Sequence, residues 1–219
     1  MLKKIFVCAL LTAALLVTGC GEEKISGSPD KAVLAFAEIA MTGSSDNMAA
    51  AGFTADDQQE IRRNMATTFV NTMASIAPLS DATAEQITNI YFDRLKGNLK
   101  FNATLKKNDA ERPIVELTAT PIDQGETARK AAAKNDDLIA LIGMVGQLKS
   151  DGATDEQLKE NADVQKLAVT ALTKYIDNIR FKPEETIDVP CKKITGRDGN
   201  IHWAPADEGD FINFLTGKN

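Results

Sequence analysis

The chain has 219 residues and a formal net charge of −6, and it is 43% hydrophobic and 26% charged. Such a balance can fill a hydrophobic core, which excludes a wholly disordered, a collagen-like or a multi-span membrane protein. The acidic charge argues against a nucleic-acid partner, because neutralising phosphates requires a basic face.

Residues 1–19 have the layout of an export signal. Lys3 and Lys4 precede an apolar run from Ile5 to Val17 that only Thr12 interrupts. The run is too short to cross about 30 Å of hydrocarbon as a stable helix. The sequence therefore predicts a signal peptide that is cleaved and takes no part in the fold.

The residues at the end of this segment, Val17-Thr18-Gly19-Cys20, resemble the lipobox of bacterial lipoproteins, with Val in place of Leu. The resemblance implies that cleavage falls before Cys20 and that the Cys20 thiol carries a diacylglyceryl group. Two or three acyl chains hold a protein on a bilayer far more durably than one chain does. Residues 20–28 lack hydrophobic periodicity and are predicted to be the lipidated cysteine and a flexible tether.

Helical spacing of apolar residues dominates the next part of the chain. Thr83 and Gln86 form a capping-box pair and are expected to begin the fourth helix. The predicted helices run from Ser28 to Gly43, from Met48 to Ala51, from Thr54 to Pro78 and from Thr83 to Gly97.

The period then changes to the alternation of strands. Leu99 to Leu105 and Val115 to Ala119 predict an antiparallel hairpin. Helical spacing returns between Glu126 and Arg180, and Leu138 to Leu148 is apolar nearly all round, which predicts a helix covered on most sides.

The chain ends in a second hairpin and a helix. The predicted hairpin joins Ile187–Cys191 to Ile201–Trp203 through a tight turn at Asp198-Gly199, with a bulge at Lys192-Lys193 if Cys191 and Ile194 both face the core. The last helix runs from Asp207 to Leu215.

This order of elements predicts a single α+β domain over residues 29–219. An antiparallel sheet of about four strands packs against several helices, and a helical hairpin is inserted over about 126–180. The alternative is a mainly helical bundle with a small sheet.

Several features together resemble the small bacterial lipoproteins of unknown function in the nuclear-transport-factor-two-like, cystatin-like fold group. They are the helix directly after the tether (Ser28 to Met41), the strand pair around Leu99 to Thr120, the Asp198-Gly199 turn before Trp203, and the terminal helix ending at Gly217. The resemblance implies the fold only. The segment 126–180 departs from that fold, and no position matches the acid and base residues of the group's enzymes.

Cys191 and His202 are the only possible thiol–imidazole pair after processing. On an unbulged hairpin Cys191 faces Ala206, about 13 Å from His202, and with a bulge the two lie on opposite faces. We therefore expect a buried structural Cys191 and a half-exposed His202, or an intermolecular disulfide through Cys191. Trp203 is expected to pack in the core opposite Ile194.

Other motifs predict neither a metal nor a cofactor. Gly143-Met-Val-Gly146 has no strand before it and no Lys or Ser/Thr after it, so it indicates close helix packing and not a phosphate loop. The acidic clusters lack the alternate spacing of a calcium loop, and two lie at helix starts. These clusters are Asp56-Asp57, Glu184-Glu185 and Asp207-Glu208-Asp210.

The sequence thus predicts a non-enzymatic extracytoplasmic lipoprotein, anchored through Cys20 to the cell membrane or outer membrane. It would bind an envelope protein or a small ligand. The alternative is a cavity enzyme that uses carboxylate or hydroxyl residues on a cystatin-like fold. A cavity acid with a strongly raised pKa would favour that alternative.

Overall fold

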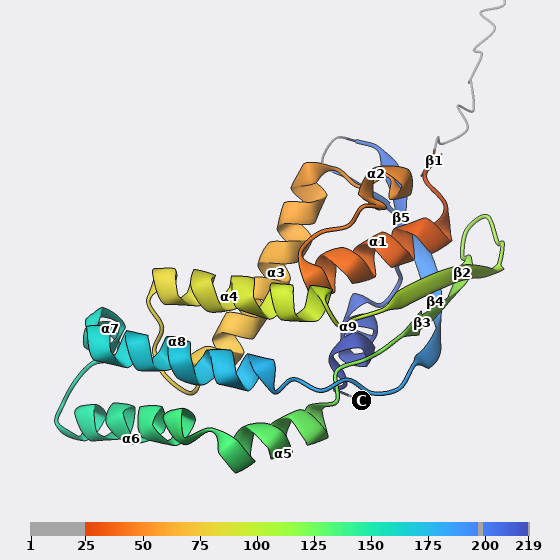
Figure 1. The fold of residues 1–219 in the computed structure, drawn as a ribbon. Helices are drawn as coiled ribbons and strands as arrows, with labels where there is room; N and C mark the ends of the chain where they lie inside the picture. The colour runs from red at the N-terminus through yellow and green to blue at the C-terminus, as the bar shows by residue number, and fades with distance from the viewer. Residues whose placement is uncertain (1–24, 197–198, 219) are drawn as a thin grey trace, which may run out of the picture.

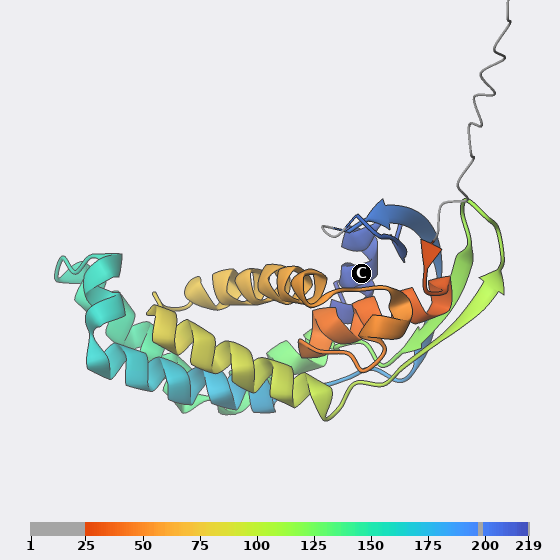
Figure 2. The same ribbon diagram turned by 90° about the horizontal axis from the view of Figure 1, so that it is seen from above.

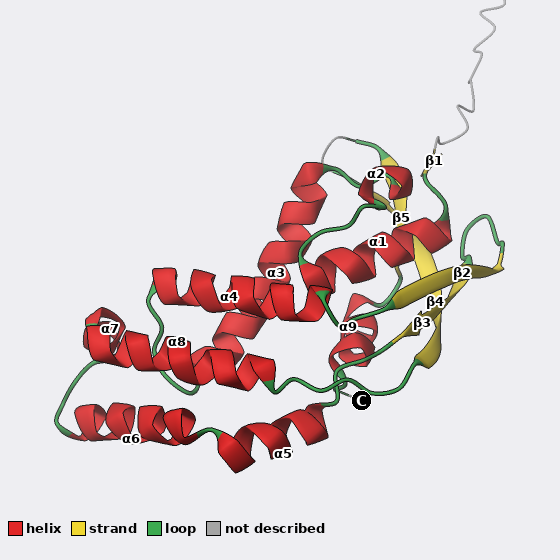
Figure 3. Cartoon of the chain, viewed as in Figure 1, coloured by secondary structure: helices red, strands yellow, loops and turns green. Residues whose placement is uncertain are grey.

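A computed structural model describes residues 25–196 and 199–218, with no side-chain detail at residues 132–134. Its helices are α1 (Pro29–Thr42), α2 (Met48–Ala51), α3 (Ala55–Ala74), α4 (Asp81–Lys96), α5 (Gln124–Lys134), α6 (Asp136–Ser150), α7 (Asp155–Glu160), α8 (Ala162–Asp177) and α9 (Glu208–Thr216). Its strands are β1 (Ile25–Ser26), β2 (Phe101–Lys107), β3 (Ile114–Ala119), β4 (Glu185–Thr195) and β5 (Ile201–Pro205). The predicted α+β class is confirmed (Figure 3).

One sheet runs in the order β1-β5-β4-β3-β2. Strands β2 to β5 pair antiparallel, and β1 pairs parallel with β5. Helix α1 packs against β2, β3 and β5, so the sheet curls around it, and Figure 2 shows α1 inside this curl. Most of α1 is therefore buried, and the ring of Phe36 meets that of Phe211 of α9 edge-on at 5.6 Å.

Residues 25–28 belong to the folded domain, although the sequence predicts them to be part of the tether. Ile25 and Ser26 pair with Ile201 and His202 of β5. A Cβ atom at Gly27 would lie 2.6 Å from the carbonyl carbon of Ala51, so the backbone packs closely there. The predicted tether is therefore too long at its C-terminal end.

Helices α6, α7 and α8, here called the helical arm, lie at the opposite end of the molecule from the sheet (Figure 1). The predicted helical segment is divided more often than expected, because Asn135 and Asn161 each cap a new helix. Asn135 Nδ2 also donates to the Ala171 carbonyl at 2.9 Å, which ties α6 to α8. Thr154 and Gln157 form a capping box at the start of α7.

The expectation that Leu138 to Leu148 is covered on most sides is wrong. Ile139 is 65% exposed and Ile142 54% exposed. The reason is that α6 is the outer helix of the arm and buries one face, through Leu141 and Val145. A Cβ atom at Gly143 or Gly146 would have no neighbour within 4 Å, so close helix packing there is also wrong.

Two local predictions are corrected by hydrogen bonds. Helix α4 begins at Asp81, because Ser80 Oγ accepts the N–H of Thr83 and acts as the cap predicted for Thr83 itself. Strands β4 and β5 have no bulge, since their register is continuous from Cys191↔Pro205 to Thr195↔Ile201.

Candidate functional site

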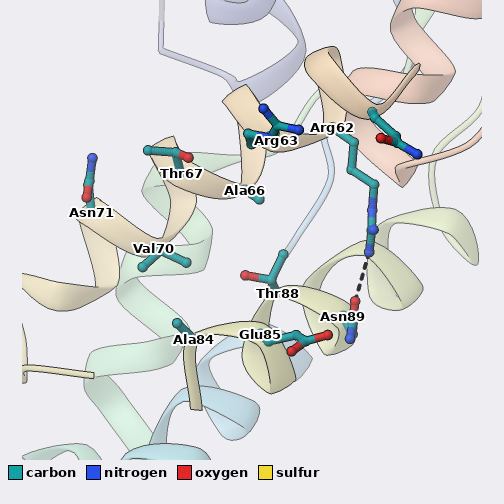
Figure 4. A pocket seen from close by; sticks show the side chains of 11 residues that line it. Arg62, Arg63, Ala66, Thr67, Val70, Asn71, Ala84, Glu85, Thr88 and Asn89 are labelled. Carbon is teal, nitrogen blue, oxygen red and sulfur yellow. Dashed lines mark hydrogen bonds between the residues drawn. The ribbon is translucent and has the colours of Figure 1, made fainter. Parts of the chain in front are cut away.

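A groove of about 660 Å³ separates helices α3 and α4 (Figure 4). The two helices run antiparallel, with α3 capped by the box of Thr54 and Asp57 and α4 capped by Ser80. Binding pockets for small molecules have volumes of about 300–1,000 Å³, so the groove has room for such a ligand. Its lining residues are Gln59, Arg62, Arg63, Ala66, Thr67, Val70, Asn71, Ala84, Glu85, Thr88 and Asn89.

The floor of the groove contains a largely buried threonine. Thr88 is only 6% exposed, and it projects from α4 into the space between the helices (Figure 4). Thr68 and Thr72 donate their hydroxyls to the carbonyl four residues earlier. Within the described residues Thr88 Oγ1 forms no hydrogen bond. Solvent reaches Oγ1 itself, so this hydroxyl can exchange a water molecule for a polar atom of a ligand.

Arg62 bridges the two walls. Its Nη2 donates to Asn89 Oδ1 at 2.9 Å (Figure 4). Its Cζ lies 5.3 Å from the centroid of the Phe92 ring. Beyond Arg62 a second hollow of about 280 Å³ reaches Gly43 and Lys96. Arg62 therefore divides one long depression into a larger and a smaller part.

The charge of the groove is opposite in sign to that of the whole chain. Arg62 and Arg63 line its α3 wall, and Glu85 is the one carboxylate among the lining residues. Neither arginine forms an ion pair with any residue in the described part of the chain. The groove thus presents two guanidinium groups against one carboxylate in a chain of net charge −6.

A second cavity, of about 110 Å³, lies on the other side of α3. Tyr91 faces it and stacks on Phe69 with ring centroids 4.1 Å apart. Burial, and secondarily the nearby Tyr175, raises the pKa of Tyr91. Its phenol therefore stays protonated, and the cavity is smaller than an ordinary ligand pocket.

The structure separates Cys191 from His202. Cys191 pairs with Pro205, and His202 pairs with Ile194, so the two side chains lie on opposite faces of the hairpin. The register differs by one residue from the prediction because Thr195 and Ile201 are paired, which makes the connecting loop longer than a two-residue turn. Asp198 of the predicted turn lies outside the described residues.

Both side chains are buried, as predicted for Cys191 but not for His202. Cys191 is 1% exposed, and burial raises the pKa of its thiol to about 12, so it is protonated at neutral pH. The prediction of a half-exposed His202 is wrong, because Phe53 covers it with ring centroids 4.7 Å apart. Trp203 packs in the core as predicted, but its partner is Lys193, whose Nζ lies 5.9 Å from the ring centroid, and not Ile194.

Two of the three acidic clusters lie at helix starts, whereas Glu184-Glu185 lies at the start of β4. Asp57 closes the capping box of α3, and Asp207 accepts the N–H of Asp210 at 2.9 Å. Within residues 25–196 and 199–218, no group of three or more His, Cys, Asp or Glu residues could hold a metal ion.

Among the described residues, two carboxyl groups have shifted pKa values, and both pKa values are lowered. Backbone N–H groups of Arg112 and Glu111 lower the pKa of Asp109 to about 2. The Arg129 guanidinium lowers the pKa of Glu126. Both carboxyl groups lie at the surface, so neither has the raised pKa that would favour a cavity acid.

Cys20 and the signal segment 1–19 lie outside the described residues, so lipidation of Cys20 stays a prediction. Among the helices that the structure describes, none is long and apolar enough to cross a membrane. The groove residues gave no signal in the sequence, because Arg62 and Arg63 belong to the polar face of an amphipathic helix and such faces are usually solvated.

Comparison with known proteins gives a family and a fold. A family model described as "Domain of unknown function (DUF5105)" matches residues 22–189. The fold is similar to the crystal structure of "a putative lipoprotein (ycdA)" from Bacillus subtilis subsp. subtilis str. 168, with a TM-score of 0.55 and 18% identity. The match covers 85% of this chain and 54% of that chain, so this chain corresponds to about half of the solved one. No curated protein matches the chain.

Proposed function

The chain belongs to the family described as "Domain of unknown function (DUF5105)", and we propose that in this member the domain is a non-catalytic binding module anchored to a membrane by lipid on Cys20. The α3–α4 groove is its binding site. The observation that carries the site is a groove large enough for a small ligand, lined by two guanidinium groups that form no ion pair in the described part of the chain.

The anchor is supported by the sequence Val17-Thr18-Gly19-Cys20 and by the description of the similar solved structure as a lipoprotein. Ile25 follows Cys20 by five residues, which span at most about 18 Å. The β1–β5 edge of the sheet would then lie close to the membrane surface. The helical arm, at the other end of the molecule, would face away from it (Figure 1).

The arrangement of α1 supports membership of the nuclear-transport-factor-two-like, cystatin-like group. In that proposal the curled sheet and the helix inside it form the shared core. The helical arm is an addition to this core. The opposite placement of Cys191 and His202 supports a module without thiol–imidazole chemistry.

The anchor is tested by replacing Cys20→Ser in the bacterium and separating membranes from soluble protein. The variant is expected to leave the membrane fraction, because the acyl acceptor is gone. Cys8→Ser, inside the signal segment, is the matched control and should stay in the membrane fraction. If Cys20→Ser also stays there, the anchor does not depend on lipid at this residue.

The binding site is tested by native mass spectrometry of protein gently extracted from its own membranes. We expect a co-purifying small molecule in the wild type and its loss in Ala66→Trp, because the indole fills the groove. Ala140→Trp adds the same side chain at an exposed position of α6 and should retain the molecule. Retention by Ala66→Trp as well would place the ligand elsewhere.

A further inference from the structure

We infer that the ligand of the α3–α4 groove is an oxyanion with an apolar body, and that Arg63 makes the main contact to its charged end. This inference rests on the proposed function, because it names the class of ligand for the same site. Carboxylate, phosphate and sulfonate groups share the relevant chemistry, since each accepts the paired N–H groups of a guanidinium.

The groove contains an apolar region and a basic region, and together they match such a ligand. Ala66, Val70 and Ala84 are half-buried and form the apolar part of the lining. On the α3 wall, Arg62 and Arg63 lie one helical turn before Ala66. A ligand that is apolar along its body and anionic at one end therefore meets a complementary surface at both places.

The two arginines differ in how much of their donor capacity is already used. Arg62 donates through Nη2 to Asn89 and lies against Phe92, so it is held in place. No hydrogen bond or ion pair engages the guanidinium of Arg63 within the described residues. A guanidinium carries five N–H donors, so Arg63 can bind an oxyanion with two of them without breaking an existing contact.

Thr88 gives a polar contact independent of charge. The residue is largely buried, and its hydroxyl projects into the groove from the α4 wall, opposite the arginines (Figure 4). An oxygen atom of the ligand would accept a hydrogen bond from this hydroxyl, which has no protein partner in the described structure.

Glu85 on the α4 wall should affect the binding of an anion in the opposite direction to Arg63. Its carboxylate repels an anion in the same groove, and removing its charge should strengthen binding. A cationic or neutral ligand would respond to these residues in the opposite direction or not at all.

The experiment compares two fluorescent probes with the same aromatic body. 8-Anilinonaphthalene-1-sulfonate carries a sulfonate, and N-phenyl-1-naphthylamine lacks it. The protein is the mature chain from residue 20 with Cys20→Ser, which removes the acyl group and so avoids detergent. Amide chemical shifts in NMR spectra locate each probe on the chain, and fluorescence titration gives its affinity.

We expect the sulfonate probe to shift amides of residues 59–71 and 84–89 and to bind about fivefold more tightly than the neutral probe. Arg63→Gln should weaken the sulfonate probe about fivefold, and Glu85→Gln should tighten it about twofold. Arg112→Gln makes the same charge change at the exposed β2–β3 turn and should have no effect. Circular dichroism verifies that each variant is folded.

The outcomes distinguish the class of ligand from the location of the binding site. If both probes occupy the groove equally well, or if Arg63→Gln leaves the sulfonate probe unaffected, the oxyanion inference is wrong and the binding groove stands. If neither probe shifts groove amides, or if the shifts fall instead around Ile139 and Ile142 of α6, the groove itself is not the binding site.

Discussion

Arg62 and Asn89 join the two walls of the groove through a hydrogen bond of 2.9 Å between Nη2 and Oδ1. The same guanidinium lies over the Phe92 ring, 5.3 Å from its centroid. These contacts connect α3 to α4 at the point where the depression divides, so they contribute both to the stability of the helix pair and to the shape of the site.

A double-mutant cycle at Arg62 and Asn89 measures this connection. Because the pair is exposed, we expect a coupling energy of about 0.5 kcal/mol between Arg62→Ala and Asn89→Ala in urea unfolding. Arg62→Ala alone should cost more than Asn89→Ala, because it also removes the contact with Phe92. Strictly additive single effects would show that the hydrogen bond contributes nothing to stability.

The two faces of α6 should respond differently to truncation. Leu141 is fully buried inside the helical arm. Leu141→Ala should therefore lower the free energy of unfolding by about 2–5 kcal/mol. Ile142 is 54% exposed, so Ile142→Ala should change it by less than about 0.5 kcal/mol. Chemical denaturation measures both. A large cost at Ile142 would mean that a contact covers this face in solution.

Helix α6 also shows which parts of the fold the sequence could predict. Periodicity located helices and strands, because the spacing of apolar residues follows the geometry of the backbone. It could not say how many sides of α6 are covered, since that depends on the position of the helix at the outside of the arm. Leu141 and Ile142 have similar side chains and adjacent numbers, yet one is buried and the other is exposed.

Register and site depend on contacts between distant segments. The β4–β5 register depends on the length of the loop after Thr195. The sequence is equally compatible with a tight two-residue turn, which would shift the register by one residue. The groove depends on how α3 and α4 lie beside each other. Arg63 and Thr88 are therefore recognised as neighbours of one cavity only in three dimensions.

Cys191 should be unreactive in the folded protein. In a protein that begins at residue 20 and carries Cys20→Ser, Cys191 is the only thiol. It is 1% exposed, with its Sγ 3.5 Å from the Val189 carbonyl oxygen. Iodoacetamide at about pH 8 should label it about a hundredfold more slowly than in urea, because labelling requires local opening. Equal rates in both conditions would contradict its burial.

The same thiol makes stability depend on alkaline pH. Burial raises the pKa of Cys191 from 9.0 to about 12 in the folded state. Its contribution is fully present below the unfolded pKa and is lost as the pH rises through the folded value, because the unfolded chain releases the proton first. Urea midpoints should therefore fall more steeply between about pH 9 and 11 in this chain than in its Cys191→Ser variant. Parallel curves for the two proteins would exclude this linkage.

Gly27 tests whether the residues before α1 belong to the fold. Gly27 has a φ of 75°, and a Cβ atom there would lie 2.6 Å from the carbonyl carbon and oxygen of Ala51. Gly152 has a φ of 94° and open space around it, so it is the matched control. Left-handed backbone strain costs about 1–2 kcal/mol at either position when Ala replaces Gly.

Gly27→Ala should cost about 1–3 kcal/mol more than Gly152→Ala, because the clash with Ala51 adds to the strain. Amide hydrogen exchange should also speed up at Ile201 and His202, which pair with Ile25 and Ser26. If Gly27→Ala costs no more than Gly152→Ala and leaves exchange in β5 unchanged, strand β1 adds no stability to the domain. The tether would then extend to Ser28, as the sequence alone predicts.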